Sequence, residues 1–196
     1  MNLLVLGPQG AGKGTQAKRI AEAYDIPHVS TGDMFRAAIA AQTPLGLEVQ
    51  GILARGELVP DDTTIAMIRE RLANEDGFVL DGFPRNLAQA EALDDMLSAI
   101  GRQLDAILFF NLSDDVAIER LRKRSEEEGR PDDTPEGIAR RLGIYHRETE
   151  PVVEYYRTTG KLVQLHADRS IDEVWIEVED ALKVAGVGST EPVKKL

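Results

Sequence analysis

Short apolar runs alternate along this chain with longer segments in which apolar residues recur every three or four positions. The runs at residues 77–80 and 106–110 have no alternating polar positions, which is typical of strands buried on both faces of a sheet. The longer segments have the spacing of helices with one buried face. This alternation predicts an α/β fold, with a parallel sheet of about five strands covered by helices on both faces. The predicted strands are residues 3–6, 27–30, 77–80, 106–110 and 161–165.

Helix-start signals indicate where several of the helices begin. Asp61 follows Leu58-Val59-Pro60 and is expected to cap the next helix, because a carboxylate at a helix start accepts hydrogen bonds from free backbone N–H groups. Ser170 and Glu173 have the spacing of a capping box and predict the start of the last helix.

A small helical insertion is expected after the second strand. The cluster Ser30-Thr31-Gly32-Asp33 signals a helix start, and turn residues divide the following segment into two short helices. The end of the chain shows no periodicity and is expected to fray. We therefore divide the chain into a core (residues 1–29 and 61–185), an insertion (residues 30–60) and a tail (residues 186–196).

A glycine-rich segment connects the first strand to the first helix and carries the strongest functional signal. It has the form G-x-x-x-x-G-K, in the strand–loop–helix context of a phosphate-binding loop. Its glycines let backbone N–H groups turn toward phosphate oxygens, the helix start adds positive dipole, and its lysine adds a charge. The candidate phosphate ligands are Gly10, Ala11, Gly12, Lys13, Gly14 and Thr15.

The residue after the lysine separates this loop from the common form. That position is usually Ser or Thr, whose hydroxyl holds Mg²⁺, whereas here it is Gly14 and the hydroxyl comes at Thr15. This departure argues against an ordinary GTPase or ATPase. The metal would be held through Thr15, water or a carboxylate. Asp81 ends a buried strand and is the first candidate carboxylate, although it could instead cap a helix. Asp33 is the second, and capping explains it nearly as well.

Arginines near the predicted strand ends form a second candidate constellation. Their guanidinium groups match phosphate oxygens bidentately and stay charged at any working pH. Phosphoryl transfer needs positioned positive charge of this kind, and the number of arginines suggests two phosphorylated ligands. The candidates are Arg36, Arg85, Arg120, Arg124, Arg130 and Arg141.

Composition and charge exclude several other classes. The 196 residues include no cysteine, so disulfides and thiolate zinc sites are impossible, zinc is not expected, and a reducing cytoplasm is the simplest location. A net charge of −11 opposes binding to nucleic acid or anionic lipid. No apolar stretch is long enough to span a membrane, and the first residues resemble no secretory signal.

Several ordered motifs together resemble the adenylate kinase family over residues 1 to about 185. The resemblance implies reversible transfer of a phosphoryl group from ATP to AMP, giving two ADP, with Mg²⁺ and usually in a monomer. The motifs are residues 7–15, Ser30-Thr31-Gly32-Asp33-Met34-Phe35-Arg36, Leu58-Val59-Pro60, Asp81-Gly82-Phe83-Pro84-Arg85 with Gln89, Arg120 with Arg124, Arg130-x-Asp132-Asp133 and Arg140-Arg141-Leu142.

The same resemblance implies roles for individual residues. Lys13 and the loop amides would hold the ATP phosphates, with Arg120, Arg124 and Arg169 also on the ATP side. AMP would be held by Thr31, Arg36, Glu57, Leu58, Val59, Gly82, Phe83, Pro84, Arg85, Gln89, Arg130 and Arg141. The catalytic set implied around the transferred group is Lys13, Arg85, Arg124, Arg130 and Arg141.

The segment that would cover the site is short, and two other functions stay open. Residues 124–134 are expected to be a lid loop, because longer relatives insert a small β-domain where this chain has only residues 125–129. A UMP/CMP kinase shares the short lid, but Thr31 and Gln89 favour adenine, since a glutamine amide both donates and accepts. A non-catalytic nucleotide switch is disfavoured by Gly14 and by the lack of D-x-x-G and N-K-x-D motifs.

Overall fold

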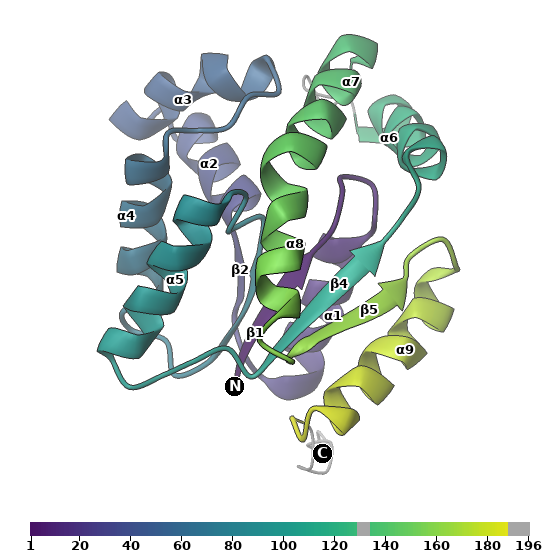
Figure 1. Cartoon of the computed structure of the whole chain (residues 1–196). Coiled ribbons are helices and arrows are strands. Elements are labelled where there is room, and N and C mark those ends of the chain that lie inside the picture. Colours follow the sequence, from purple (N-terminus) through teal and green to yellow (C-terminus); the bar gives the residue numbers. More distant parts are fainter. Residues whose placement is uncertain (129–133, 188–196) are drawn as a thin grey trace, which may run out of the picture.

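A computed structural model describes residues 1–128 and 134–187, and within them the strands form one parallel sheet (Figure 1). Its order is β2–β3–β1–β4–β5, so that β1 is central. This architecture confirms the α/β fold expected from the apolar runs. The strands are β1 (Asn2–Leu6), β2 (His28–Ser30), β3 (Phe78–Asp81), β4 (Ala106–Asn111) and β5 (Leu162–His166).

The strand register brings the carboxyl ends of β1, β2 and β3 to one edge of the sheet. Val5 pairs with Asp81 of β3 and with Leu108 of β4, and Ser30 of β2 pairs with Asp81. The loop after β1, the start of the insertion after β2 and the turn after β3 therefore leave the sheet side by side. Ligands of parallel α/β sheets bind at such carboxyl ends.

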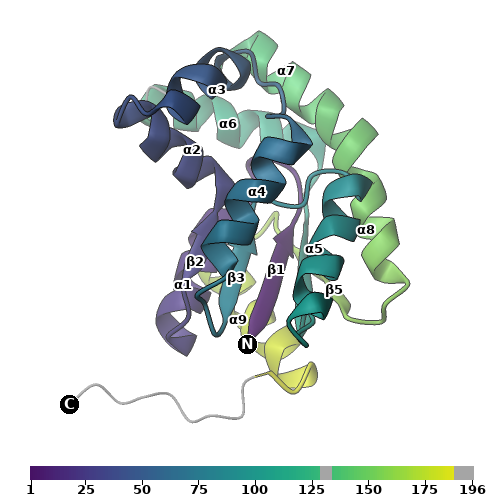
Figure 2. The same cartoon turned by 90° about the vertical axis from the view of Figure 1, so that its left-hand side faces the viewer.

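Side chains of β1 alternate between two apolar layers. Leu3 and Val5 belong to a cluster that includes residues of α1 (Lys13–Tyr24) and α9 (Ile171–Val184). Leu4 and Leu6 belong to a second cluster with residues of α4 (Asp61–Leu72), α5 (Leu87–Ala99) and α8 (Glu150–Arg157). The sheet is thus covered by helices on both faces, as Figures 1 and 2 show from two directions.

The segment between β2 and α4 has a small apolar cluster of its own. It contains α2 (Thr31–Ala40) and α3 (Pro44–Ala54), which are the two short helices expected there. Phe35, Val49 and Val59 form the centre of this cluster. The helices pack very closely at Gly46, where an added Cβ would lie 2.1 Å from the carbonyl oxygen of Ala38. Only glycine fits at that contact.

Helix α6 (Asp114–Glu128) continues past Arg124, so residues 124–128 of the expected lid loop are helical. Residues 129–133 lie outside the described residues. The sequence pattern identified no element between this segment and β5, where the structure contains α7 (Pro135–Ile144), a π-helical turn η1 (Tyr145–Thr149) and α8. The π turn ends two residues before Pro151, which has no N–H to donate into a regular helix. No described helix has the length and apolarity of a membrane span.

Candidate active site

The glycine-rich loop lies over the end of β4 and the start of α6. Gly7, Gly10 and Gly12 have φ angles of +142°, +84° and +78°, which disfavour residues with a side chain. A Cβ at Gly7 would lie 2.5 Å from the carbonyl oxygen of Phe110. Gly12 precedes α1 without any side-chain cap, so the first N–H groups of this helix have no side-chain acceptor there. These open amides suit an anion.

The side chain of Lys13 folds back onto the loop and binds its backbone. Its ammonium group donates hydrogen bonds to the carbonyl oxygens of Gly7 (2.7 Å) and Pro8 (2.8 Å). An ammonium has three donors, so one remains for a ligand. Burial lowers the pKa of Lys13 to about 8; Asp81 opposes this shift, whereas Arg85 and Arg124 add to it. These charges act on Lys13 from β3, the turn after it and α6, so four of the predicted site residues form one electrostatic cluster.

Asp81 fits the role of a carboxylate beside the phosphate loop. Its Oδ2 atom lies 3.6 Å from Nε2 of His28. A Cβ atom added at Gly14 would lie 3.4 Å from the same oxygen, so the carboxylate is next to the loop. Burial alone would raise the pKa of Asp81, but His28, Lys13 and Arg85 together hold it below its usual value. The alternative of a helix cap is wrong, because Asn86 caps α5. The site therefore keeps an ionised carboxylate next to the loop.

The donor set around Asp81 fits Mg²⁺ bound mainly by phosphate and water. Proteins commonly hold this ion through one or two carboxylates, and substrate phosphates complete its shell. Among residues 1–128 and 134–187, no cluster of three acidic or histidine side chains could hold a metal without a ligand's help. Thr15 is exposed at the start of α1, where its hydroxyl is accessible.

Asp33 and Arg36, two predicted site residues, pair with each other. The carboxylate of Asp33 accepts a hydrogen bond from the Arg36 guanidinium. Burial acts to raise the pKa of Asp33, but Arg36, with Lys18 and His28, keeps it below its usual value. Asp33 does not cap α2: Ser30 does, by accepting the N–H of Asp33 at 3.3 Å. Both side chains of the pair are about half exposed.

A tight turn after β3 connects Asp81 to the insertion. The hydroxyl of Thr31 donates to the carbonyl oxygen of Gly82 (2.9 Å), which also accepts from Nε of Arg85 (2.7 Å). A Cβ at Gly82 would lie 2.6 Å from the Thr31 hydroxyl, so this contact requires glycine. Phe83 and Pro84, joined by a cis peptide bond, are buried behind the turn. Thr31 and Arg85 thus share one anchor.

Gln89 is buried, with only 2% of its surface exposed. Its Oε1 accepts the backbone N–H of Arg85 (2.8 Å), and its Nε2 donates to Oδ1 of Asp61 (2.7 Å). An ordinary exposed helix residue is therefore not the explanation for this glutamine. The expectation that Asp61 caps α4 is wrong: Pro60 occupies the cap position without a side-chain bond, and Asp61 instead holds Gln89 and Asn86.

The end of the insertion meets α7 at Gly56 and Glu57. Glu57 binds Arg55 (2.9 Å) and also Arg140 of α7 (3.2 Å). Arg141 is only 8% exposed. It packs against Gly56, where an added Cβ atom would lie 3.0 Å from the Cγ of Arg141. Leu58 is half-buried beside Val59, whose side chain belongs to the insertion's apolar cluster.

Arg120 bonds to the backbone rather than projecting into solvent. It donates to the carbonyl oxygens of Ala167 (2.7 Å), Arg169 (3.3 Å) and Gly10 (3.4 Å). It therefore joins the phosphate loop to the segment that follows β5. The guanidinium of Arg169 pairs with Glu177 of α9. Arg130, with Asp132 and Asp133, lies outside the described residues.

Sequence reasoning missed three side chains at this site. His28 contacts Asp81, Asn86 bonds to Asp61, and the hydroxyl of Thr149 donates to the carbonyl oxygen of Arg85 (2.7 Å). His28 precedes the Ser30-Thr31 motif by two positions, on the strand next to the one that ends in Asp81. Aligning these two predicted strands in parallel could have indicated that His28 lies near Asp81. The partners of Asn86 and Thr149 are not marked by any local pattern.

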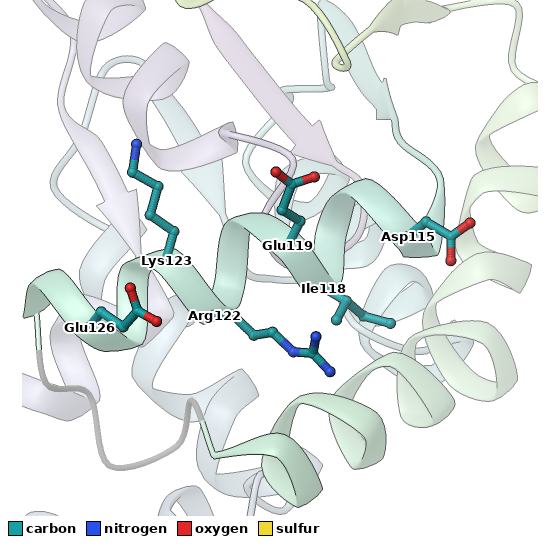
Figure 3. Close-up of a pocket in the computed structure, with 6 residues that line it drawn as sticks. All are labelled: Asp115, Ile118, Glu119, Arg122, Lys123 and Glu126. Carbon is teal, nitrogen blue, oxygen red and sulfur yellow. The ribbon is translucent and has the colours of Figure 1, made fainter.

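A separate surface hollow of about 480 Å³ lies along α6 (Figure 3). Its described lining comes from α6 alone and mixes both charge signs, so it presents no concentrated positive field to a phosphate. No predicted site residue lines it. The lining residues are Asp115, Ile118, Glu119, Arg122, Lys123 and Glu126.

Comparisons with known proteins agree with this geometry. A family model described as adenylate kinase matches residues 5–161, which include every residue of the phosphate loop. The adenylate kinase of Xanthomonas euvesicatoria pv. vesicatoria (strain 85-10) is 46% identical over 185 residues, covering 93% of this chain and 99% of the relative. The adenylate kinase of Parvibaculum lavamentivorans (strain DS-1) is 46% identical over 191 residues, covering 94% and 93%.

Proposed function

Because this chain belongs to the adenylate kinase family, we propose that it catalyses the reversible, Mg²⁺-dependent transfer of a phosphoryl group from ATP to AMP, yielding two ADP. The observation that carries this proposal is the electrostatic cluster of Lys13, Asp81, Arg85 and Arg124. It lies between a loop built for one phosphate chain and a turn that is hydrogen-bonded to Thr31 and Gln89. Two phosphorylated ligands can therefore meet there.

On the donor side, the loop amides and Lys13 bind the phosphates of ATP. The remaining N–H of the Lys13 ammonium faces the ligand, while its other two bonds keep the loop in shape. Arg120 keeps the loop against the segment after β5. The proposed donor-side residues are Gly10, Ala11, Gly12, Lys13, Gly14, Thr15, Arg120, Arg124 and Arg169.

On the acceptor side, Thr31 and Gln89 face the adenine, and arginines bind the phosphate of AMP. Arg85 is fixed by its bond to Gly82, which places its charge next to the Lys13 cluster. The proposed acceptor-side residues are Thr31, Arg36, Glu57, Leu58, Val59, Gly82, Phe83, Pro84, Arg85, Gln89, Arg130 and Arg141.

In the reaction, a phosphate oxygen of AMP attacks the terminal phosphorus of ATP. The bond from that phosphorus to the bridging oxygen breaks, and the electron pair stays on the ADP that leaves. The protein forms no covalent bond. Its contribution is positioned positive charge, from Lys13, Arg85 and Arg124, with Arg130 and Arg141 proposed for the same role.

Mg²⁺ would be held by the ATP phosphates and, through water, by Asp81. When bound, the ion neutralises phosphate charge and orients the phosphate chain. Asp33 is a second candidate, although its carboxylate is already paired with Arg36. The chain contains no cysteine, so we propose no zinc site.

We also propose a division of the chain that follows this chemistry. The core (residues 1–29 and 61–185) carries the donor site and part of the acceptor site, the insertion (residues 30–60) contributes the rest of the AMP site, and residues 124–134 cover the site. The separate apolar cluster of the insertion supports treating it as a unit. We propose that the protein is a cytoplasmic monomer whose partners are ATP, AMP and ADP.

An acceptor panel tests the proposed function. ATP and Mg²⁺ are mixed with AMP, CMP, UMP or GMP, and ADP is measured over time. A site that reads adenine through polar groups should give AMP a kcat/KM at least roughly a hundredfold above the others. Equal rates with CMP or UMP would favour a UMP/CMP kinase. Slow release of phosphate with no use of AMP would favour a nucleotide switch. No observation at this site favours either alternative.

A further inference from the structure

We propose that Asp61 is a positioning residue that fixes the amide of Gln89 in the orientation that reads adenine. This inference rests on the proposed function, because it needs Gln89 to contact the acceptor base. Asp61 lies in the first turn of α4, next to the insertion, whereas Gln89 lies on α5. The contact joins the start of α4 to the helix that carries Gln89.

The contact geometry leaves the Gln89 amide a single orientation. A carboxylate only accepts hydrogen bonds, so Oδ1 of Asp61 must face the NH₂ end of the amide, at 2.7 Å. A backbone N–H only donates, so that of Arg85 must face the carbonyl end, at 2.8 Å. Rotating the amide by half a turn would place donor against donor and acceptor against acceptor. Both bonds are at a residue that is almost fully buried, where such a mismatch is costly.

Asp61 is itself held in place. Its Oδ1 also accepts a hydrogen bond from Nδ2 of Asn86 (2.9 Å). Asn86 in turn caps α5 by accepting the N–H of Gln89 at 2.9 Å. Asp61, Asn86 and Gln89 thus form a closed set of hydrogen bonds. Asp61 makes no side-chain cap on α4. Among the described residues, its carboxylate accepts hydrogen bonds from Asn86 and Gln89.

A fixed amide selects among purines. One lone pair and one N–H of Gln89 are used by Arg85 and Asp61, which leaves one acceptor and one donor. Adenine offers an amino donor at position 6 and a ring acceptor beside it. Hypoxanthine offers the reverse, a carbonyl acceptor and a ring N–H donor. An amide free to rotate would suit both bases, whereas an amide held by Asp61 at one end and by the N–H of Arg85 at the other suits only adenine.

The test compares kcat/KM for AMP with that for inosine monophosphate (IMP) in a set of variants. Asp61→Ala removes the acceptor and should lower the AMP:IMP ratio by about tenfold to a hundredfold, the scale of a hydrogen bond to a charged group. Asp61→Asn keeps one acceptor oxygen and should retain more of the ratio. Asp62→Ala removes the neighbouring, exposed first-turn carboxylate and should leave the ratio within about twofold.

A purely structural role for Asp61 would give a different result. Asp61→Ala would then lower kcat/KM for AMP and for IMP equally, and that outcome overturns the proposal. So does an unchanged ratio. If Asp61→Ala does not fold, Asp61→Ser carries the same test, because it keeps a favourable first-turn residue but withdraws the acceptor by one bond.

The Gln89→Ala variant separates this inference from the function on which it rests. We expect Gln89→Ala to lower the AMP:IMP ratio, and Asp61→Ala to cause no further change in that background. A further change would mean that Asp61 acts on the base by another route, which contradicts the proposal. If Gln89→Ala leaves the ratio intact, the proposed base reading by Gln89 fails and this inference fails with it. If only the Asp61 variants leave it intact, the inference alone fails.

Discussion

Lys13 shows how one residue can be both a structural part of the loop and a ligand for phosphate. Two of its three donors hold the carbonyl oxygens of Gly7 and Pro8, while burial keeps its pKa near 8. A bound phosphate chain brings negative charge beside this ammonium and must raise that pKa. Binding of ATP is therefore linked to protonation of Lys13.

This linkage gives the first prediction. At pH 8 the free enzyme carries Lys13 about half protonated, so binding of ATP should take up about half a proton. Calorimetric titrations in buffers with different ionisation enthalpies measure this uptake. Lys13→Met should abolish it. An equal uptake in wild type and Lys13→Met would assign the proton to another group.

The same shift affects stability with a defined sign. The pKa of Lys13 is about 8 in the folded protein, against an ordinary value of 10.5 in the unfolded chain. Between these pH values the unfolded chain binds more protons, so the contribution of Lys13 to the free energy of unfolding increases as pH rises through that window. Below about pH 8 the charged, buried lysine destabilises the free enzyme, and bound phosphate offsets this cost.

At the scale of elements, Arg120 connects α6, the phosphate loop and the segment after β5. Its bond to the carbonyl oxygen of Ala167 is the shortest of the three, at 2.7 Å. Arg120→Ala should lower the free energy of unfolding by about 1–2 kcal/mol, which corresponds to a Tm loss of about 2–8 °C, and should raise the KM for ATP more than that for AMP.

Arg122→Ala is the matched control for this prediction, because Arg122 lies on the same helix but lines the surface hollow (Figure 3). It should leave both Tm and the KM for ATP nearly unchanged. Equal losses in the two variants would show that α6 tolerates no arginine removal, and the bridging role of Arg120 would be wrong.

A histidine connects α6 to the π turn before α8. Nε2 of His146 lies 2.9 Å from Oδ2 of Asp114, and Nδ1 lies 3.0 Å from Oε2 of Glu150. Both ring nitrogens must carry protons to donate to two carboxylates, and the bonds to Glu150 and Asp114 raise the pKa of His146. The ring of Tyr145 packs edge-on against it.

Because the folded pKa of His146 is raised, its stabilising effect is complete below the unfolded pKa of 6.5 and is lost as pH rises through the folded value. His146→Gln should therefore lower stability at pH 6 by less than about 1 kcal/mol, given an exposed pair, and not at pH 9. Urea unfolding at both pH values measures this difference. A loss that is equal at pH 6 and pH 9 would point to packing rather than charge.

Sequence patterns predicted the sheet well because apolar runs mark strands buried on both faces. A parallel arrangement of those strands requires the phosphate loop, Ser30 and Asp81 to lie at one edge, and the strand register confirms this. The patterns did not indicate α7 and α8, because Pro135, Gly143 and Pro151 interrupt the helical spacing of apolar residues there. They also failed at Asp61, because an acid at a helix start resembles a cap and its partner Gln89 lies 28 residues away.

In the molecule as a whole, the proposed reaction brings ATP and AMP together in one site. The chain has a net charge of −11, yet Lys13 at the start of α1, Arg85 after β3 and Arg124 of α6 act on one another electrostatically. Local concentration of positive charge explains how an acidic protein could bind two anionic nucleotides. In the proposed reaction, the phosphoryl group passes directly between them.

Product balance measured by phosphorus NMR tests this claim most directly. Enzyme, ATP, AMP and Mg²⁺ are mixed, and all phosphorus signals are followed to equilibrium. We expect two ADP for each ATP and AMP consumed, no inorganic phosphate, and a rate lowered by at least about 10²-fold in Lys13→Met. Release of inorganic phosphate with AMP left unchanged, or a Lys13→Met variant with normal turnover, would contradict direct transfer between the two nucleotides.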